Sequence, residues 1–175
     1  MSTNTSGEAL PHVILRNVLD ADRDFLDELD LPEVGGEWDS FDDSPDQLLH
    51  GKDYGGGKKI VGVDEGTNVG SVSWIQVPYG PNVRSLAWSI GITIHPDFRN
   101  RHFGSSAQRT LAKQLLTASE ANRVQADTDP DNIPEQRALL RAGFTMEGLA
   151  RKAQWRRGNW HDRLVFSVLR QDIFR

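Results

Sequence analysis

An apolar strand runs directly into a basic turn and a helix start between Ile92 and Gln108, in the run ITIHPDFRNRHFGSSAQ. The first N–H groups of a helix have no intrahelical partner and the helix dipole is positive there, so such a turn suits an anion. Gly104 would let the backbone approach a ligand closely, and Arg99 and Arg101 add guanidinium groups suited to phosphate oxygens. A basic loop before a helix explains these residues equally well, so the interpretation needs support from the rest of the chain.

Hydrophobic periodicity divides most of the chain into strand-like and helix-like segments. Strands are predicted over 12–18, 59–64, 69–77, 85–94, 123–127, 145–155 and 161–170, and helices over 20–31, 104–119 and 132–142. A shorter helix is predicted near 46–50, inside an irregular stretch. The order predicts an α+β (mixed α/β) fold, with a single layer of sheet and helices on its faces.

The helices carry specific signals at their ends and on their faces. Asp20 is the predicted cap of the first helix, and Asn132 is the predicted cap of the last, with Glu135 as its capping-box partner and Gly143 as its terminator. In the segment 104–119 the apolar residues recur at helical spacing. The polar residues Gln108, Arg109 and Lys113 are predicted to face away from the core.

The composition of the 175 residues argues against several classes of protein. The absence of cysteine excludes disulfides, thiolate metal sites and a cysteine nucleophile. A net charge of −5 argues against a general nucleic-acid binder, and no apolar run approaches the roughly 18 residues that span a bilayer. The five histidines lack metal-ligand spacing. We therefore expect a cytoplasmic protein with no metal, nucleic acid or membrane as partner, composed of a flexible leader (1–11) and one domain (12–175).

The run PDFRNRHFGSSAQRTLAKQLL resembles motif A of the GNAT superfamily of N-acyltransferases, in which Arg/Gln-x-x-Gly-x-Gly/Ala cradles the pyrophosphate of coenzyme A. Arg99 takes the first position, Arg101 the usual basic position and Gly104 the second glycine-class position. His102 departs from the pattern, because it stands where the family usually has glycine.

Three further segments extend the resemblance over nearly the whole chain from Val13. DPDNIPEQRALLRAGF is similar to the family's downstream segment, with Asn132 in the CoA-contacting asparagine position. MEGLARKAQWRRGNWHDRLVFSVLRQD resembles the closing hairpin of the RimJ/RimL branch, and VILRNVLDAD resembles its opening. The resemblance implies a GNAT-like domain with a mostly antiparallel sheet of six to seven strands and a parallel pair splayed at the acyl-CoA site.

The resemblance also implies acetyl-CoA, or a related acyl-CoA, as co-substrate. Ile92 and Ile94 would pair their backbone with the pantetheine arm. The implied cofactor-binding set is completed by Arg99, Asn100, Arg101, His102, Phe103, Gly104, Ser105, Asn132 and Arg137.

The sequence assigns no residue to proton transfer. The family's glutamate, tyrosine and serine positions are occupied here by Ser89, Leu139 and Glu135. Ser89 could hold a water and His95 could relay protons, although a structural role is the better expectation for both. Asp127 and Asp129 could attract an ammonium, although turn formation is the better expectation for them. Trp74, Trp88 and Trp155 could line an acceptor pocket, although core packing is the better expectation.

The leading hypothesis is an N-acetyltransferase that transfers the acetyl group to a primary amine by direct attack in a ternary complex. The acidic segment 33–46 favours a cationic small molecule as acceptor, and a protein N-terminus remains open. The fold is compatible with a homodimer. The alternative is a non-catalytic acyl-CoA-binding sensor or interaction module of the same fold. A nucleotide-binding regulator is a third hypothesis.

Overall fold

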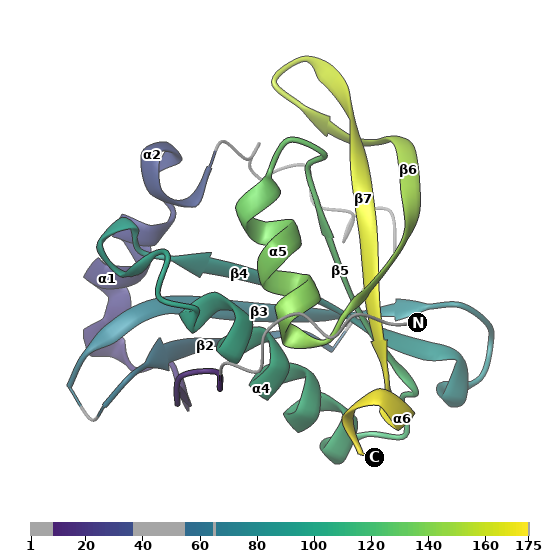
Figure 1. Cartoon of the computed structure of the whole chain (residues 1–175), viewed down its shortest axis with the longest axis horizontal. Coiled ribbons are helices and arrows are strands. Elements are labelled where there is room, and N and C mark those ends of the chain that lie inside the picture. Colours follow the sequence, from purple (N-terminus) through teal and green to yellow (C-terminus); the bar gives the residue numbers. More distant parts are fainter. Residues whose placement is uncertain (1–8, 37–54, 65, 175) are drawn as a thin grey trace.

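The computed structural model describes residues 9–36, 55–64 and 66–174, and these contain one seven-stranded sheet in the order β1-β2-β3-β4-β5-β7-β6 (Figure 1). Its strands are β1 (Ile14–Asn17), β2 (Gly57–Gly62), β3 (Asn68–Pro78), β4 (Leu86–Ile94), β5 (Arg123–Thr128), β6 (Thr145–Arg156) and β7 (Asn159–Leu169). Each predicted strand is present, with ends displaced by a few residues, because strand ends depend on pairing as well as on local pattern.

Among the strands that the structure describes, only β4 and β5 run parallel, and they pair over just two positions, Trp88 with Val124 and Ser89 with Gln125. Beyond Ser89 the strand β4 continues to Ile94, still paired with β3 but no longer with β5. All other neighbours are antiparallel. The predicted α+β fold with a splayed parallel pair is therefore confirmed.

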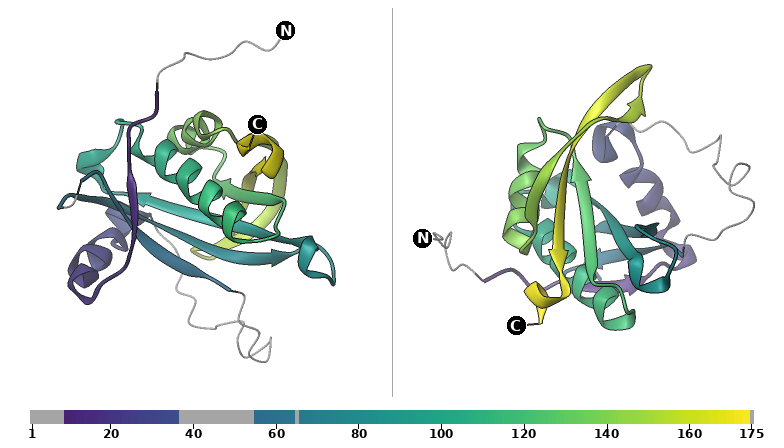
Figure 2. Two further views of the ribbon diagram at one scale, coloured as in Figure 1. Left: turned by 90° about the horizontal axis from the view of Figure 1, so that it is seen from below. Right: turned by 90° about the vertical axis from the view of Figure 1, so that its right-hand side faces the viewer.

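Helices cover both faces of the sheet (Figure 2). They are η1 (Asp20–Asp22), α1 (Arg23–Leu29), α2 (Pro32–Gly35), η2 (Val83–Ser85), η3 (Pro96–Phe98), α4 (Phe103–Ala118), α5 (Ile133–Ala142) and α6 (Arg170–Ile173). The helices α4 and α5 pack on one face and on each other, whereas α1 and α2 lie on the opposite side. Adjacent residues of β2 show the two faces, since Val61 joins the core under α4 and Ile60 is buried outside that cluster.

The main core lies between α4, α5 and the sheet. Leu111, Leu115 and Leu116 of α4 pack there with buried strand residues, among them Val72, Ile90, Val124, Phe166 and Val168. The chain passes from β4 through η3 to this helix, and the N-terminus of α4 lies beside the end of β4. The core thereby positions the site.

Two predictions about the N-terminal helix need correction. Asp20 is not its cap, because η1 precedes α1 and no side-chain cap bond forms at either start. The short helix α2 was not predicted. The predicted helix near 46–50, the acidic residues from 37 to 46 and residues 1–8 of the leader lie outside the described residues.

Within those same ranges, no helix combines the length and apolar character that a membrane span requires. The described part of the chain also contains no group of three or more His, Asp or Glu side chains arranged to hold a metal ion. The predicted cytoplasmic location stays a prediction.

Candidate functional site

A cavity of about 690 Å³ opens where β4 and β5 part. Its walls come from the end of β4, the turn before α4, the first turns of α4 and α5, and α2. The lining residues are Val34, Gly35, Gly36, Ile92, Thr93, Ile94, Phe98, Arg99, Asn100, His102, Phe103, Gly104, Ser105, Asn132, Pro134, Glu135, Arg137, Ala138 and Arg141. Ten of the eleven residues predicted to bind a cofactor are in this set, and Arg101 is the exception.

The N-terminus of α4 opens into the cavity without a side-chain cap. Its first amides, on Phe103, Gly104 and Ser105, have no intrahelical partner, because a helix cannot supply one in its first turn. Their outward direction is set by two non-glycine residues with left-handed backbone, Asn100 (φ 61°) and His102 (φ 63°). His102 thus adopts a backbone conformation that glycine, the usual residue of the family at this position, adopts readily. The turn therefore keeps its backbone conformation although histidine replaces glycine, and its amides stay accessible to a ligand.

Gly104 lines the cavity and has room for a small side chain. A methyl group built at this position would lie 3.7 Å from Ile94 Cγ1 and 3.9 Å from Ile92 Cδ1, which are ordinary contacts. The fold itself therefore does not require glycine here. A larger side chain would extend into the cavity.

The open edge of β4 presents backbone groups to the same space. The amide of His95 donates to the carbonyl of Val69 on β3, and residues of an antiparallel strand alternate in direction. Ile92 and Ile94 consequently point their N–H and C=O groups away from β3, toward the side that β5 has left. The carbonyl of Ile94 accepts a bond from Arg99 Nε at 3.0 Å.

The two arginines of the turn have different surroundings. Arg99 lines the cavity, and its Nη2 donates to the carbonyl of Val34 at 2.6 Å, which links α2 to the end of β4. Arg101 lies outside the cavity, with its guanidinium 5.7 Å from the ring centre of Phe98. The sequence did not distinguish them.

The first turn of α5 supplies the carboxyl group of Glu135, which the sequence predicts as a cap partner and which the resemblance places at the family's serine position. Asn132 caps α5 as predicted, accepting from the amide of Glu135 at 3.3 Å. The side chain of Glu135 does not complete a capping box; it accepts from Gln108 Nε2 of α4 at 2.5 Å. The prediction that Gln108 faces away from the core is wrong, since it is 1% exposed and lies against α5.

Burial raises the pKa of Glu135 to about 7, and the hydrogen bond from Gln108 offsets only part of this increase. A titratable group near neutrality thus lines the cavity. Burial beside a polar partner depends on how α4 crosses α5, so no local pattern could have identified it.

The two weak catalytic candidates lie outside the cavity lining. Ser89 is the last residue of β4 that pairs with β5, at the point where the strands separate. The ring of His95 bridges Glu28 Oε1, 3.1 Å from its Nε2, and the amide of Asp97, which donates to Nδ1. These contacts give His95 a structural role between α1 and η3.

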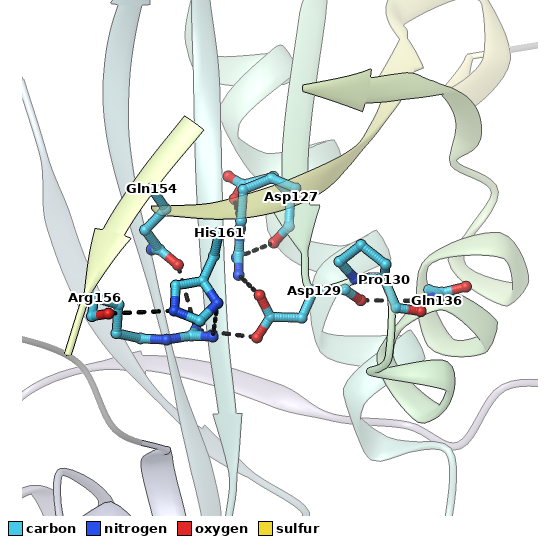
Figure 3. Close-up of polar contacts among 8 residues, drawn as sticks. Asp127, Asp129, Pro130, Gln136, Gln154, Arg156 and His161 are labelled. Atoms are coloured by element: carbon cyan, nitrogen blue, oxygen red, sulfur yellow. Dashed lines mark hydrogen bonds and ion pairs between the residues drawn. The ribbon is translucent and has the colours of Figure 1, made fainter. Parts of the chain in front are cut away.

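Polar side chains gather where β5 ends (Figure 3). Arg163 of β7 binds Asp127 through Nε at 2.5 Å and Asp129 through Nη1 at 2.8 Å, and Arg156 reaches Asp129 at 3.0 Å. Burial opposes ionisation of Asp129, but Arg156 and Arg163 together lower its pKa. Both carboxylates are therefore matched by guanidinium groups, which weakens the hypothesis that they attract a substrate ammonium.

The three tryptophans considered for an acceptor pocket differ in their exposure. Trp74 and Trp88 pack against the core, as the packing interpretation predicts. Trp155 does not, since it is 52% exposed near the end of the β6–β7 hairpin and contacts Trp160 edge-to-face.

Comparison with known proteins adds a family to this geometry. The acetyltransferase (GNAT) domain family matches residues 12–145. The chain is 24% identical over 85 residues to the uncharacterized N-acetyltransferase YnaD of Bacillus subtilis, covering 49% of the chain and 50% of the relative. It is 28% identical over 104 residues to the probable N-acetyltransferase YjcK of the same organism, covering 59% and 56%. The chain thus spans about half the length of the curated relatives it matches.

Solved structures share the fold at lower identity. Spermidine N-acetyltransferase from Vibrio cholerae, in complex with CoA and spermine, matches with a TM-score of 0.71 and 17% identity over 93% of this chain and 98% of that one. Mycobacterium smegmatis RimJ, in complex with CoA-disulfide, matches at 0.70 and 20% identity over 93% and 84%. The fold neighbours therefore include a member of the predicted branch. With most of its length matched, this chain belongs to the acetyltransferase (GNAT) domain family.

Proposed function

We propose that the protein is an acyl-CoA-dependent N-acetyltransferase that transfers the acetyl group of acetyl-CoA to a primary amine. The observation that supports this most is the meeting, in one cavity, of the uncapped α4 amides and the unpaired edge of β4. The amides suit a diphosphate, and the strand edge suits a chain that carries amide groups. We also propose that residues 12–175 form one domain around this site.

The charge of the cavity fits such a cofactor. The described lining includes the cationic side chains Arg99, Arg137 and Arg141, with His102 beside Arg141, and one carboxyl group, Glu135. In this proposal the amides of Phe103, Gly104 and Ser105 bind the diphosphate with Arg99 and Asn100, and Asn132 binds an amide of the pantetheine arm. Ile92 and Ile94 pair with that arm through their backbone. Arg101 would act only through the field of its charge.

The bound cofactor supplies the activated acetyl group as a thioester. The amine nitrogen attacks its carbonyl carbon, the N–C bond forms, the C–S bond breaks, one proton leaves nitrogen and one is bound by sulfur. An alkylammonium must first lose a proton, which costs roughly 4 kcal/mol at pH 7. Holding both reactants in line contributes more than a single weak base can, so direct attack in a ternary complex needs no strongly basic side chain.

The acceptor is a primary amine in this proposal, and two classes have support. Fold neighbours include a spermidine N-acetyltransferase and a ribosomal-protein-S5-alanine acetyltransferase from Vibrio fischeri. Because Asp127 and Asp129 are already paired with arginines, a polyamine would need other anionic contacts. A homodimer stays a prediction.

The test measures free thiol during incubation with acetyl-CoA and one of three acceptors: spermidine, spermine or a peptide with N-terminal alanine. We expect thiol release with at least one acceptor and its suppression by Gly104→Leu, which fills the cavity. Gly104→Ala is the matched control and should bind acetyl-CoA within a few-fold of the parent. Acetyl-CoA binding without thiol release on any amine would favour the sensor alternative, and tighter binding of ATP than of acetyl-CoA would favour a nucleotide-binding regulator.

A further inference from the structure

Gln108 and Glu135 form a polar pair inside the interface between α4 and α5. Gln108 Nε2 donates to Glu135 Oε1, while Gln108 Oε1 is buried with no hydrogen-bond partner among the described residues. Glu135 lines the cavity as the third residue of α5, two positions after Ile133. The pair therefore connects an unsatisfied buried acceptor to the proposed cofactor site.

The unsatisfied amide oxygen favours one protonation state of its neighbour. A buried acceptor without a partner costs about 1–3 kcal/mol. A carboxylate cannot donate a hydrogen bond, but a protonated carboxyl group can. Neutral Glu135 could accept from Gln108 Nε2 with one oxygen and donate to Gln108 Oε1 with the other, so that each polar group of the pair is satisfied.

The charged groups around Glu135 do not hold it ionised. Arg137 and Arg141 share its helix, and Arg99 and His102 line the cavity from the β4–α4 turn, yet the described residues show no ion pair between any of them and Glu135. Arg109 of α4 donates instead to the carbonyl of Ala142. On the side of β5, Asp129 is engaged by Arg156 and Arg163.

We infer that Glu135 is a positioning residue of the proposed acyl-CoA site that holds a proton whenever the cofactor is bound, as an acid–amide pair with Gln108. This inference rests on the proposed function. The cofactor brings several phosphate charges into the cavity and covers its opening, and both effects disfavour a carboxylate. If Glu135 is ionised in the protein without ligand, binding of acetyl-CoA is accompanied by uptake of one proton from solvent, and the Glu135 carboxyl group holds that proton.

Titration calorimetry with acetyl-CoA, in two buffers of different ionisation enthalpy between pH 6 and 9, measures this proton directly. The parent should bind acetyl-CoA about tenfold more weakly at pH 8 than at pH 6, because the fraction of protonated Glu135 falls across that range. Glu135→Gln keeps the shape and mimics the neutral form, so it should bind about tenfold more tightly than the parent at pH 8. Protons exchanged by the cofactor phosphates are the same for the parent and for Glu135→Gln, so they cancel when the proton uptake of the two proteins is subtracted.

Asp131→Asn is the matched control, since it removes one negative charge from an exposed position next to Asn132. It should retain the proton uptake and pH dependence of the parent. If Glu135→Gln also retains both, the inference is wrong while the proposed function stands. If the parent protein binds no acetyl-CoA at any pH, the proposed function itself fails. An infrared band of a neutral carboxylic acid in the parent complex, lost in Glu135→Gln, would support the inference independently of affinity.

Discussion

The guanidinium of Arg163 on β7 is bound to the carboxylate of Asp127 on the neighbouring strand β5, with Nε 2.5 Å from Oδ2 and Nη2 3.0 Å from the Asp127 carbonyl. Arg163 is only 6% exposed, and the same guanidinium reaches Asp129. The pairing fixes the end of β5, from which the chain continues into the first turn of α5. The ion pair between Arg163 and Asp127 therefore stabilises the wall formed by α5, although neither residue lines the cavity.

Replacing Arg163 with leucine should lower the free energy of unfolding by about 1–3 kcal/mol, because it leaves the Asp127 carboxylate without its guanidinium partner and leaves Asp129 with Arg156 alone. Urea denaturation at pH 7 measures the change. Arg84→Leu is the control: its side chain is 82% exposed and its ion pair with Glu120 is 3.5 Å long, so the loss should stay within about 0.5 kcal/mol. Equal losses in the two variants would contradict the structural role of Arg163.

The ionised carboxylate of Asp22 should stabilise the fold at neutral and mildly acidic pH, and this stabilisation should be lost in strong acid. The hydrogen bonds from Arg16, followed by that from the Leu19 amide, lower its pKa to about 2 from the ordinary 3.8. A carboxyl group with a lowered pKa stabilises the fold above its unfolded pKa, and that contribution is lost as the pH falls through about 2. Asp22→Asn should cost about 1–2 kcal/mol at pH 7, with the difference from the parent shrinking between pH 4 and 2 in urea titrations. A difference that stays constant over this range would refute the prediction.

Glu135 should have the opposite pH dependence in the protein without ligand. Its pKa is raised, so its contribution to stability is present below the ordinary 4.5 and is lost as the pH rises through about 7. The interval between these values corresponds to roughly 3 kcal/mol at most. Glu135→Gln should therefore gain stability relative to the parent between pH 5 and 9, measured by urea denaturation. Parallel stability curves for the two proteins would show that the carboxyl group does not titrate in this range.

His102 should be more easily replaced by glycine than by alanine. Its φ of 63° is a left-handed conformation that costs a residue with a Cβ about 1 kcal/mol or more. His102→Gly and His102→Ala both remove the contact with Arg141, so their difference isolates the backbone effect. We expect the glycine variant to be more stable by about 1 kcal/mol in chemical denaturation. Equal stabilities would mean that the turn does not need this conformation.

Arg99 and Arg101 should differ in their effect on the cofactor. Arg99 lines the cavity, so Arg99→Ala should raise the KM for acetyl-CoA by about tenfold or more, as expected for loss of a charge-assisted hydrogen bond. Arg101 is directed to the ring of Phe98, so Arg101→Ala should change that KM by about twofold or less. Steady-state kinetics at saturating amine compare the variants. A large effect of Arg101→Ala would show that this side chain reaches the phosphates.

Local sequence patterns were sufficient for most elements of the fold, and the family resemblance predicted ten of the residues that line the cavity. Alternating and helical periodicities depend on near neighbours along the chain, so the strands and the helices α4 and α5 could be predicted from them. The turn from Arg99 to Gly104 is continuous in sequence, which is why its exposed amides were predictable as one unit. The splayed parallel pair, formed by β4 and β5, was predicted from the family resemblance and not from local patterns.

Other features depend on residues far apart in the chain. Gln108 is separated from Glu135 by 27 positions and Arg163 from Asp127 by 36, and neither pair has a pattern that marks it. Helical spacing placed Gln108 on a polar face, but the packing of α5 against α4 buries that face and withdraws the Glu135 carboxyl group from water. The sequence by itself determined which segments form strands, helices and a turn with uncapped helix amides, because those preferences are local. Only the tertiary structure decided which charges are paired and which carboxyl group is desolvated, because both depend on the surfaces that packing brings together.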